Sequence, residues 1–173
     1  MTGTSRTRMV AILVGVGVAG TPVAPTTTAA ALPWCAPDAT SLSTSAPASP
    51  GDFRQIHVDL IVTNTSSDPC ALQGYPAVQL IGPDDPTWGP EYDLPQQSGD
   101  PQLLTLAPGA VAGSRLTFLP ETPDGWVPRS ILVTLPNTSE PLETPWIPGG
   151  IAVLRQDGAT HPGTYIGPLH LVG

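Results

Sequence analysis

The 173-residue chain is acidic and contains no lysine: six arginines face fourteen aspartates and glutamates, for a formal net charge of −8. This charge excludes the basic stripes with which nucleic-acid-binding proteins neutralise phosphates, so we expect no nucleic-acid partner. It also disfavours binding to anionic lipid. The 23 prolines and 18 glycines favour turns over long helices.

Residues 1–31 are expected to be a secretory signal peptide. Arginines at positions 6 and 8 precede an apolar run over residues 9–20, and small residues follow at 29–31. This order of basic, apolar and small-residue regions is typical of an export signal, with cleavage after Ala30 or Ala31. The apolar run is about a dozen residues long, short of the roughly 20 that span a bilayer, so we expect no stable membrane insertion after processing.

Two other fates of this segment are alternatives. It would act as an uncleaved anchor if the small residues were not processed. It would be a lipoprotein leader if Cys35 carried the lipid, but Trp34 stands before this cysteine, where a small residue is usual. We therefore expect a secreted protein that is extracellular or associated with the cell wall.

The remaining chain has the length of one domain. Residues 32–51 are expected to be a partly ordered lead-in that contains Cys35 and a first weak strand at 40–44, and residues 52–173 the remainder of the domain. Apolar and polar side chains alternate over residues 56–62, which predicts a half-buried strand. Further strands are predicted at 77–81, 111–119, 130–135, 150–154 and 165–172. Short strands with dense turns between them favour an all-β, immunoglobulin-like antiparallel β-sandwich.

Two motifs stand out along this pattern. The first reads Cys-Ala-Leu-Gln-Gly-Tyr-Pro-Ala-Val over residues 70–78, and the second reads Leu-Ala-Pro-Gly-Ala-Val-Ala over residues 106–112. Together with Cys35 at the start of the domain, they resemble, in the same order, the domain of unknown function 4232 family of exported actinobacterial proteins. The resemblance covers roughly residues 35–172. It implies the fold and export, but no activity, because the family has none assigned.

The two cysteines beyond the signal segment should pair, because an exported chain meets oxidising conditions. We expect a disulfide between Cys35 and Cys70; a metal or redox role lacks further ligands at the necessary spacing. Many members of the family carry a second cysteine pair that this chain lacks. Packing of Trp126 and Trp146 is expected to take its place.

The corner after Cys70 is expected to be architectural. Gly74 can adopt a backbone angle that other residues avoid, and Pro76 fixes the exit of the chain from the corner. Tyr75 is expected to bury its ring and to bond its hydroxyl to the backbone, as corner tyrosines in sandwiches do. Pro108 and Gly109 are expected to form a second structural turn.

The segment over residues 84–93 is the candidate site for ligand contact. Four carboxylates and two aromatic rings lie in a stretch rich in proline and glycine: Asp84, Asp85, Trp88, Glu91, Tyr92 and Asp93. The carboxylates could perform acid–base chemistry or hold Ca²⁺, although the spacing matches no calcium loop. The aromatic rings could stack on a sugar or a peptide. The alternative is a solvated acidic loop with Trp88 folded onto the edge of the sandwich.

No catalytic signature accompanies this loop. The three histidines are His57 on the solvated face of a strand, His161 in a loop and His170 facing outward, and no pair has zinc spacing. The chain has no Gly-x-Ser-x-Gly elbow. We expect neither a metal nor another cofactor, and no catalytic residue is assigned. A non-catalytic binding or structural module is the favoured function, its partner a cell-wall component or an extracellular protein; a glycan-acting enzyme that uses the acidic-loop carboxylates is the alternative.

Overall fold

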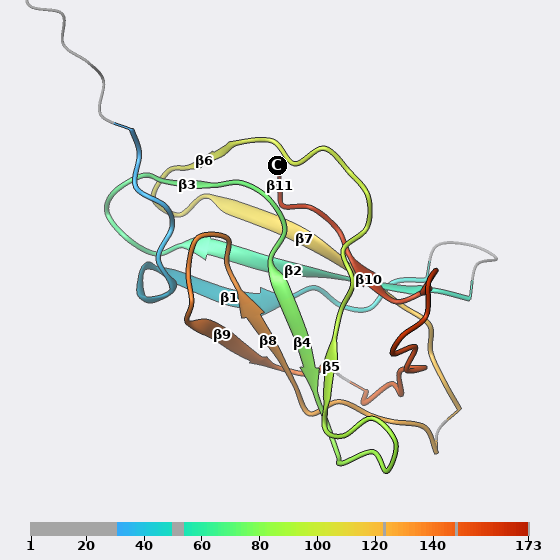
Figure 1. Cartoon of the computed structure of the whole chain (residues 1–173). Helices are drawn as coiled ribbons and strands as arrows, with labels where there is room; N and C mark the ends of the chain where they lie inside the picture. Colours follow the sequence, from blue (N-terminus) through green and yellow to red (C-terminus); the bar gives the residue numbers. More distant parts are fainter. Residues whose placement is uncertain (1–30, 50–53, 123, 148, 173) are drawn as a thin grey trace, which may run out of the picture. The chain divides into compact units, whose positions relative to one another are not determined.

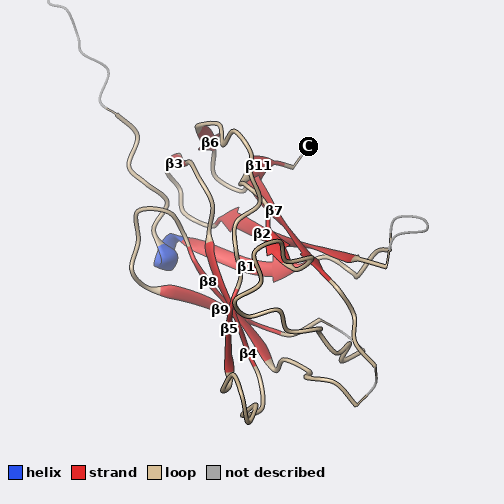
Figure 2. Ribbon diagram, turned by 45° about the vertical axis from the view of Figure 1, so that its right-hand side comes forward, coloured by secondary structure: helices blue, strands red, loops and turns tan. Residues whose placement is uncertain are grey.

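The computed structural model describes residues 31–49, 54–122, 124–147 and 149–172. Apart from Ala31, the predicted signal peptide lies outside these described residues. Within them the chain is built almost entirely from short strands, with one turn of 3-10 helix, η1 (Pro37–Ala39) (Figure 2). No helix in the described part of the chain has the length and apolarity to cross a membrane.

Two antiparallel sheets and a small two-stranded ribbon make up the fold (Figure 1). The first sheet has the order β1-β2-β7-β10, with β11 also paired to β7, and contains β1 (Thr40–Thr44), β2 (Ile56–Asn64), β7 (Val111–Phe118), β10 (Tyr165–Ile166) and β11 (His170–Leu171). The second sheet has the order β5-β4-β8-β9 and contains β4 (Ala77–Ile81), β5 (Glu91–Asp93), β8 (Ser130–Thr134) and β9 (Pro141–Pro145). The ribbon pairs β3 (Cys70–Leu72) with β6 (Leu104–Leu106).

This strand order confirms the predicted antiparallel sandwich. In an immunoglobulin-like fold one sheet has the order A-B-E-D and the other contains C, F and G, with C′ added beside C in variable-type domains. The strands β1, β2 and β7 occupy the places of A, B and E, and β5-β4-β8-β9 has the order C′-C-F-G. The place of D beside E is taken here by the C-terminal strands β10 and β11.

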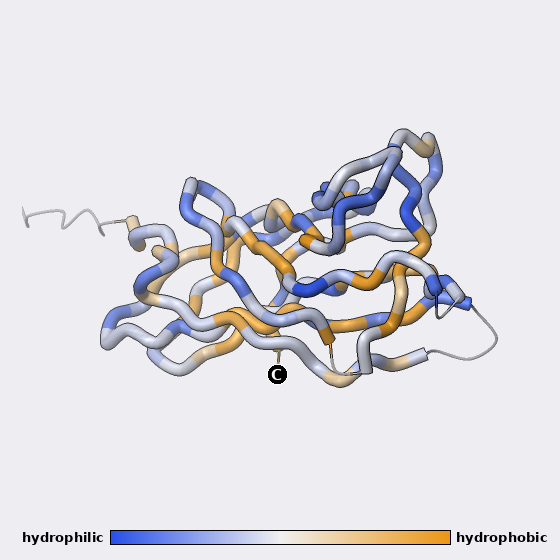
Figure 3. The backbone as a smooth tube through the Cα atoms, turned by 90° about the horizontal axis from the view of Figure 1, so that it is seen from below, coloured by the Kyte–Doolittle hydropathy of each residue, from blue (hydrophilic) through white to orange (hydrophobic). Residues whose placement is uncertain are grey.

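The core lies between the two sheets and follows from the alternation along each strand. The side chains at alternating positions of β2 are buried, as are those of β4 and β8. In Figure 3 hydrophobic stretches run through the middle of the domain, and hydrophilic stretches are frequent in the outer turns. The fully buried apolar residues from the two facing sheets include Val58, Leu60, Val62, Leu80, Leu116, Phe118, Ile131 and Val133.

The predicted disulfide is confirmed. Cys35 and Cys70 are bonded, with their α-carbons 4.9 Å apart, and both are buried. Backbone hydrogen bonds from Cys35 to Ala71 (3.0 Å) and from Ala71 to Pro33 (2.8 Å) accompany the bond. The disulfide therefore fixes the segment before β1 to strand β3.

Two predicted strands differ from the structure. Residues 150–154 contain only an isolated bridge between Val153 and Pro120, because Gly149 and Gly150 turn the backbone with φ of 95° and 59° before a ladder can start. The strand predicted at 165–172 is divided into β10 and β11, since Pro168 lacks an N–H to donate. Three residues lie between the two strands opposite two on β7, which makes a bulge.

Four strands were not expected from the pattern: β3, β5, β6 and β9. The first three have three residues each, too few to show alternation. Strand β9 begins and ends with proline, which ordinarily argues against a strand. It is tolerated here because β9 is the last strand of its sheet and pairs with β8 on one side alone.

The expectation for Tyr75 is wrong. Its ring is only half-buried, and among the described residues its hydroxyl has no hydrogen-bond partner. The buried tyrosine is instead Tyr92, 2% exposed, whose hydroxyl accepts a hydrogen bond from the backbone N–H of Gln156 (3.3 Å). The corner itself has the expected backbone, with φ of 113° at Gly74.

The two tryptophans that were expected to pack in place of a second disulfide are both in the core. Trp126 is 9% exposed and Trp146 is 7% exposed. The ring of Trp146 lies 5.3 Å from that of Phe118, and its indole N–H donates to the carbonyl of Ile151 (2.9 Å). Trp126 meets Tyr92 edge to face, with ring centroids 6.4 Å apart.

Candidate functional site

The loop between β4 and β5 carries the candidate site. Beyond the last strand pair, Gly82 donates to Pro90 (2.9 Å), and Asp85 and Gly89 exchange two backbone hydrogen bonds (3.2 and 2.8 Å). Gly89 has φ of 73°, which favours glycine at this position. The loop is thus a hydrogen-bonded extension of the hairpin with a tight turn at its tip.

The carboxylate of Asp85 organises that turn. Its Oδ1 accepts the backbone N–H groups of Thr87 (2.8 Å) and Trp88 (2.9 Å). These two hydrogen bonds hold the pKa of Asp85 below its usual value of 3.8, with a smaller contribution from the positive charge of Arg155. Asp85 is therefore an ionised structural group at neutral pH, and its Oδ2 accepts no hydrogen bond from the described residues.

Arg155 fixes the loop to the rest of the domain. Its side chain is 5% exposed and forms two hydrogen bonds with the carboxylate of Asp157 (2.9 and 2.7 Å). The other contacts of its guanidinium group are backbone carbonyls of the loop: Gly89 (2.6 Å), Glu91 (2.6 Å) and Trp88 (3.3 Å). A buried cation paired with one carboxylate thus holds two residues of the loop, Trp88 and Gly89, and the first residue of β5.

Two aromatic rings hold the guanidinium of Arg155 in place. It lies 4.8 Å from the ring centroid of Trp126 and 5.3 Å from that of Tyr92, both within the range of a cation–π contact. The indole N–H of Trp126 donates to the carbonyl of Pro83 (2.9 Å), which is a further tie to the loop. A side chain at Gly82 would meet the Trp126 ring at 2.5 Å, so this close approach requires glycine.

A pocket of about 320 Å³ lies beside this support. Trp88 and Leu154 are among the residues that line it, and they are 51% and 38% exposed. Three of the residues that line the pocket are acidic. The complete lining is Asp85, Trp88, Glu121, Asp124, Gly125, Trp126, Leu154 and Arg155. Trp88 is thus half-exposed at a pocket, whereas the alternative of a ring folded onto the edge of the sandwich would bury it further.

The acidic residues expected to act together are divided between two surfaces. Asp85 lines the pocket beside Trp88, whereas Asp93 lies on β5 and accepts a hydrogen bond from Gln79 (2.7 Å). Asp84 and Glu91 are exposed. The prediction that Tyr92 contacts a ligand is wrong, because its position in β5 turns the side chain into the core.

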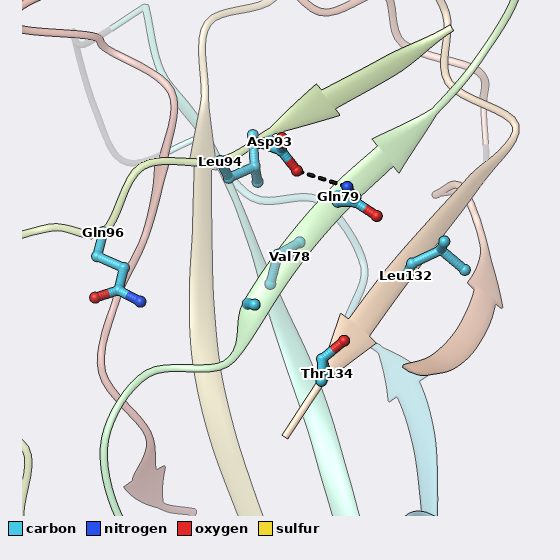
Figure 4. A pocket seen from close by; sticks show the side chains of 8 residues that line it. Val78, Gln79, Asp93, Leu94, Gln96, Leu132 and Thr134 are labelled. Atoms are coloured by element: carbon cyan, nitrogen blue, oxygen red, sulfur yellow. Dashed lines mark hydrogen bonds between the residues drawn. The ribbon is translucent and has the colours of Figure 1, made fainter. Parts of the chain in front are cut away.

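Asp93 borders a second pocket, of about 330 Å³, on the outer face of the second sheet (Figure 4). The side chains of Gln79 and Leu132 lie on neighbouring strands in this view, with Thr134 at the end of β8 and Gln96 on the segment that follows β5. Leu132 is directly opposite Gln79 in the sheet register. This pocket is an open depression on a sheet face, separate from the one beside Trp88.

Six residues that line the pocket beside Trp88 lie far from the loop in sequence: Glu121, Asp124, Gly125, Trp126, Leu154 and Arg155. None of them was expected at the site from the sequence. The one available signal was the scarcity of basic residues, since an arginine in a lysine-free acidic chain is a natural partner for carboxylates. Their convergence depends on the segments at 119–126 and 152–155, which exchange backbone hydrogen bonds.

The histidines do not join this site. His57 lies on the outer face of β2, half-buried, with its Nδ1 3.0 Å from the hydroxyl of Thr117. Burial lowers its pKa below 6.5, and the charge of Arg115 acts in the same direction. His161 and His170 are exposed. In the described ranges, no three His, Cys, Asp or Glu side chains are placed to hold a metal ion.

Comparison with known proteins identifies the family of the chain. Residues 35–165 match the family model described as Domain of unknown function (DUF4232), so the chain belongs to this family. The search of curated proteins gave no match, and neither did the search of solved structures. The match confirms the resemblance seen in the Cys-Gly-Tyr-Pro and Pro-Gly motifs, and it carries no activity with it.

Proposed function

We propose that this protein is a secreted, non-catalytic binding module whose ligand contacts the pocket beside Trp88. The observation that carries the proposal is the exposure of this tryptophan on a loop that a buried arginine holds in place. An exposed aromatic ring offers a large contact area, and little entropy is lost when its support is already rigid.

The support for the ligand contact is the contrast between Trp88 and the other rings of the site. Tyr92 and Trp126 are buried and hold Arg155, so their burial has an evident structural reason. Trp88 is half-exposed, and in the described part of the chain its indole N–H has no hydrogen-bond partner. Large aromatic side chains left at the surface beside a pocket are characteristic of binding sites.

The proposal that the protein is exported rests on two features. Residues 1–31 have the order of a signal peptide, and disulfides such as Cys35–Cys70 persist in oxidising compartments. Intact-mass analysis of culture filtrate tests this: we expect a chain that begins at Ala31 or Leu32, without lipid on its cysteines. A diacylglycerol adduct, or a chain that still begins at Met1, would contradict it.

The binding proposal is tested by incubating the protein with cell-wall and culture fractions and with purified polysaccharides. We expect saturable binding that Trp88→Ala abolishes and Trp34→Ala leaves intact. Trp34 is a matched control because it is also exposed, at 44%, and lies beside Ala71, away from the pocket. Equal binding by the Trp88→Ala protein would show that the ligand contacts another surface.

The alternative proposal is a glycan-acting enzyme that uses the loop carboxylates. It has less support, because Asp85 and Asp93 line different pockets. The hydrogen bonds that lower the pKa of Asp85 also favour its ionised form, which is unsuited to a general acid. Turnover of a polysaccharide that is lost on Asp85→Asn and retained in Trp88→Ala would favour the enzyme over the binding module.

A further inference from the structure

We propose that the pocket beside Trp88 receives the cationic side chain of an arginine or a lysine that belongs to a partner peptide or protein. The proposal rests on the binding function proposed above and specifies the chemistry of the ligand. Two features of the pocket lead to it: carboxylates that supply both an excess of hydrogen-bond acceptors and a negative charge, and exposed apolar surface beside them.

The free polar groups of the pocket are mostly acceptors. Each nitrogen of the Arg155 side chain donates within the protein, and the indole N–H of Trp126 donates to Pro83. The carboxylates of Glu121 and Asp124 have no hydrogen-bonding or ion-pair partner in the described part of the chain. Guanidinium and ammonium groups carry donors and no acceptors, so they match this pocket fully, whereas a sugar hydroxyl can donate to a carboxylate but also brings acceptor lone pairs for which the pocket offers few donors.

The charge of the pocket is unbalanced in the same direction. Arg155 is the single basic residue in the lining, and Asp157, outside the lining, already pairs with it at 2.7 Å. Asp85, Glu121 and Asp124 therefore remain as negative charges that Arg155 does not fully neutralise. A cation that entered would meet three carboxylates and no free basic group among the lining residues.

The pocket also exposes apolar surface that the stem of such a side chain can cover. Trp88 and Leu154 are exposed at the pocket, at 51% and 38%. The methylene groups of lysine and arginine cover apolar surface while their charged ends remain among polar groups, and either cation can lie on a tryptophan face. The pocket volume of about 320 Å³ is at the small end for ligand sites, which suits one side chain of a larger partner.

The test uses a blocked five-residue peptide with one central arginine, and copies with lysine or citrulline at that position. Citrulline keeps the shape of arginine and has no charge. Binding is followed by the NMR shift of the Trp88 indole N–H. We expect the arginine and lysine peptides to bind at least about tenfold more tightly than the citrulline peptide, as for a desolvated cation–π and ion-pair contact.

Variants locate the contact. Glu121→Gln combined with Asp124→Asn should remove the preference for arginine over citrulline. The matched control is Glu140→Gln combined with Glu143→Gln, which removes the same charge from exposed positions at the second sheet and should keep the preference. Thermal melts of both variants verify that the fold is retained.

Equal affinity for the citrulline peptide, or no saturable shift with peptide up to about 10 mM, would overturn the inference, since weaker binding could not define a specific site. A preference that survives Glu121→Gln with Asp124→Asn would overturn it as well. The proposed binding function is tested separately. Trp88-dependent binding of a neutral polysaccharide would support that function and would contradict the choice of a cationic ligand.

Discussion

The guanidinium group of Arg155 lies 4.8 Å from the ring centroid of Trp126, and the same group donates hydrogen bonds to carbonyl oxygens of the loop that carries Trp88. One buried side chain therefore connects the core to the exposed tryptophan. This relationship separates the residues that support the site from those that can contact a ligand.

Arg155→Ala should destabilise the protein by about 3–5 kcal/mol, because it leaves the Asp157 carboxylate and two loop carbonyls without their buried partner. Urea unfolding followed by tryptophan fluorescence measures this. Arg115→Ala is the matched control: Arg115 pairs with Asp59 at the surface, with side chains 56% and 34% exposed, and should cost less than about 1 kcal/mol. Equal losses in the two variants would show that Arg155 has no special structural role.

Tyr92 should contribute more to stability than Tyr75, although the sequence predicted Tyr75 as the buried anchor. Tyr92→Ala should cost about 3–5 kcal/mol, because it removes a fully packed ring that also contacts Arg155. Tyr75→Ala should cost less than about 2 kcal/mol, since its ring is half-buried. Denaturant midpoints of the two variants compare them directly, and a more damaging Tyr75→Ala would restore the corner tyrosine as the main anchor.

Removal of the disulfide should destabilise the fold by about 4 kcal/mol in the chain-entropy model, given the separation of 35 residues between Cys35 and Cys70. We expect a lower melting temperature in the Cys35→Ser, Cys70→Ser double variant, and a similar decrease when the native protein is reduced. Equal melting temperatures of the reduced and the oxidised protein would mean that backbone pairing alone holds the lead-in segment.

The Asp85 turn should weaken at low pH. Because the pKa of Asp85 is lowered in the folded protein, its contribution is complete above the usual value of 3.8 and is lost as the pH falls through the lower folded value. The amide NMR signals of Thr87 and Trp88, which donate to this carboxylate, should titrate with a midpoint below 3.8. Asp85→Asn should abolish that titration; a midpoint at or above 3.8 would mean that the two hydrogen bonds do not persist in solution.

His57 should titrate below 6.5, because burial opposes its charged form and Arg115 repels it. Since the folded pKa is lowered, the neutral ring favours folding above 6.5, and this contribution is lost as the pH falls below 6.5 toward the folded pKa. Ring-proton NMR of the native protein gives the midpoint. Arg115→Ala should raise that midpoint, and a lower or unchanged value would exclude the proposed influence of Arg115.

Several structural features could be predicted from local pattern. The alternation of apolar residues located β2, and turn residues bounded β4, β7 and β8 to within about a residue at each end, which is the usual uncertainty of strand boundaries. The pairing of Cys35 with Cys70 followed from there being two cysteines beyond the predicted signal peptide. These features depend on neighbours in the chain or on the number of cysteines, so they are visible without a fold.

The roles of Tyr75 and Tyr92 could not be assigned in this way. Both follow proline- and glycine-rich sequence, and only the pairing of β5 with β4 determines that Tyr92 turns toward the core. The same applies to Arg155, whose partners at Trp88, Gly89 and Glu91 are more than sixty residues away in the chain.

Alternation, cysteine count and composition are local or additive properties, so the class of fold, the disulfide and the acidic character of the chain could be predicted from them. Which acids share a pocket and which aromatic rings are exposed could not be predicted in this way. Those properties depend on how the loop at 82–90 meets the segments at 119–126 and 152–155. Arg155 and Trp126 make the contacts between them, and a contact between distant segments has no period or spacing in the sequence that would reveal it.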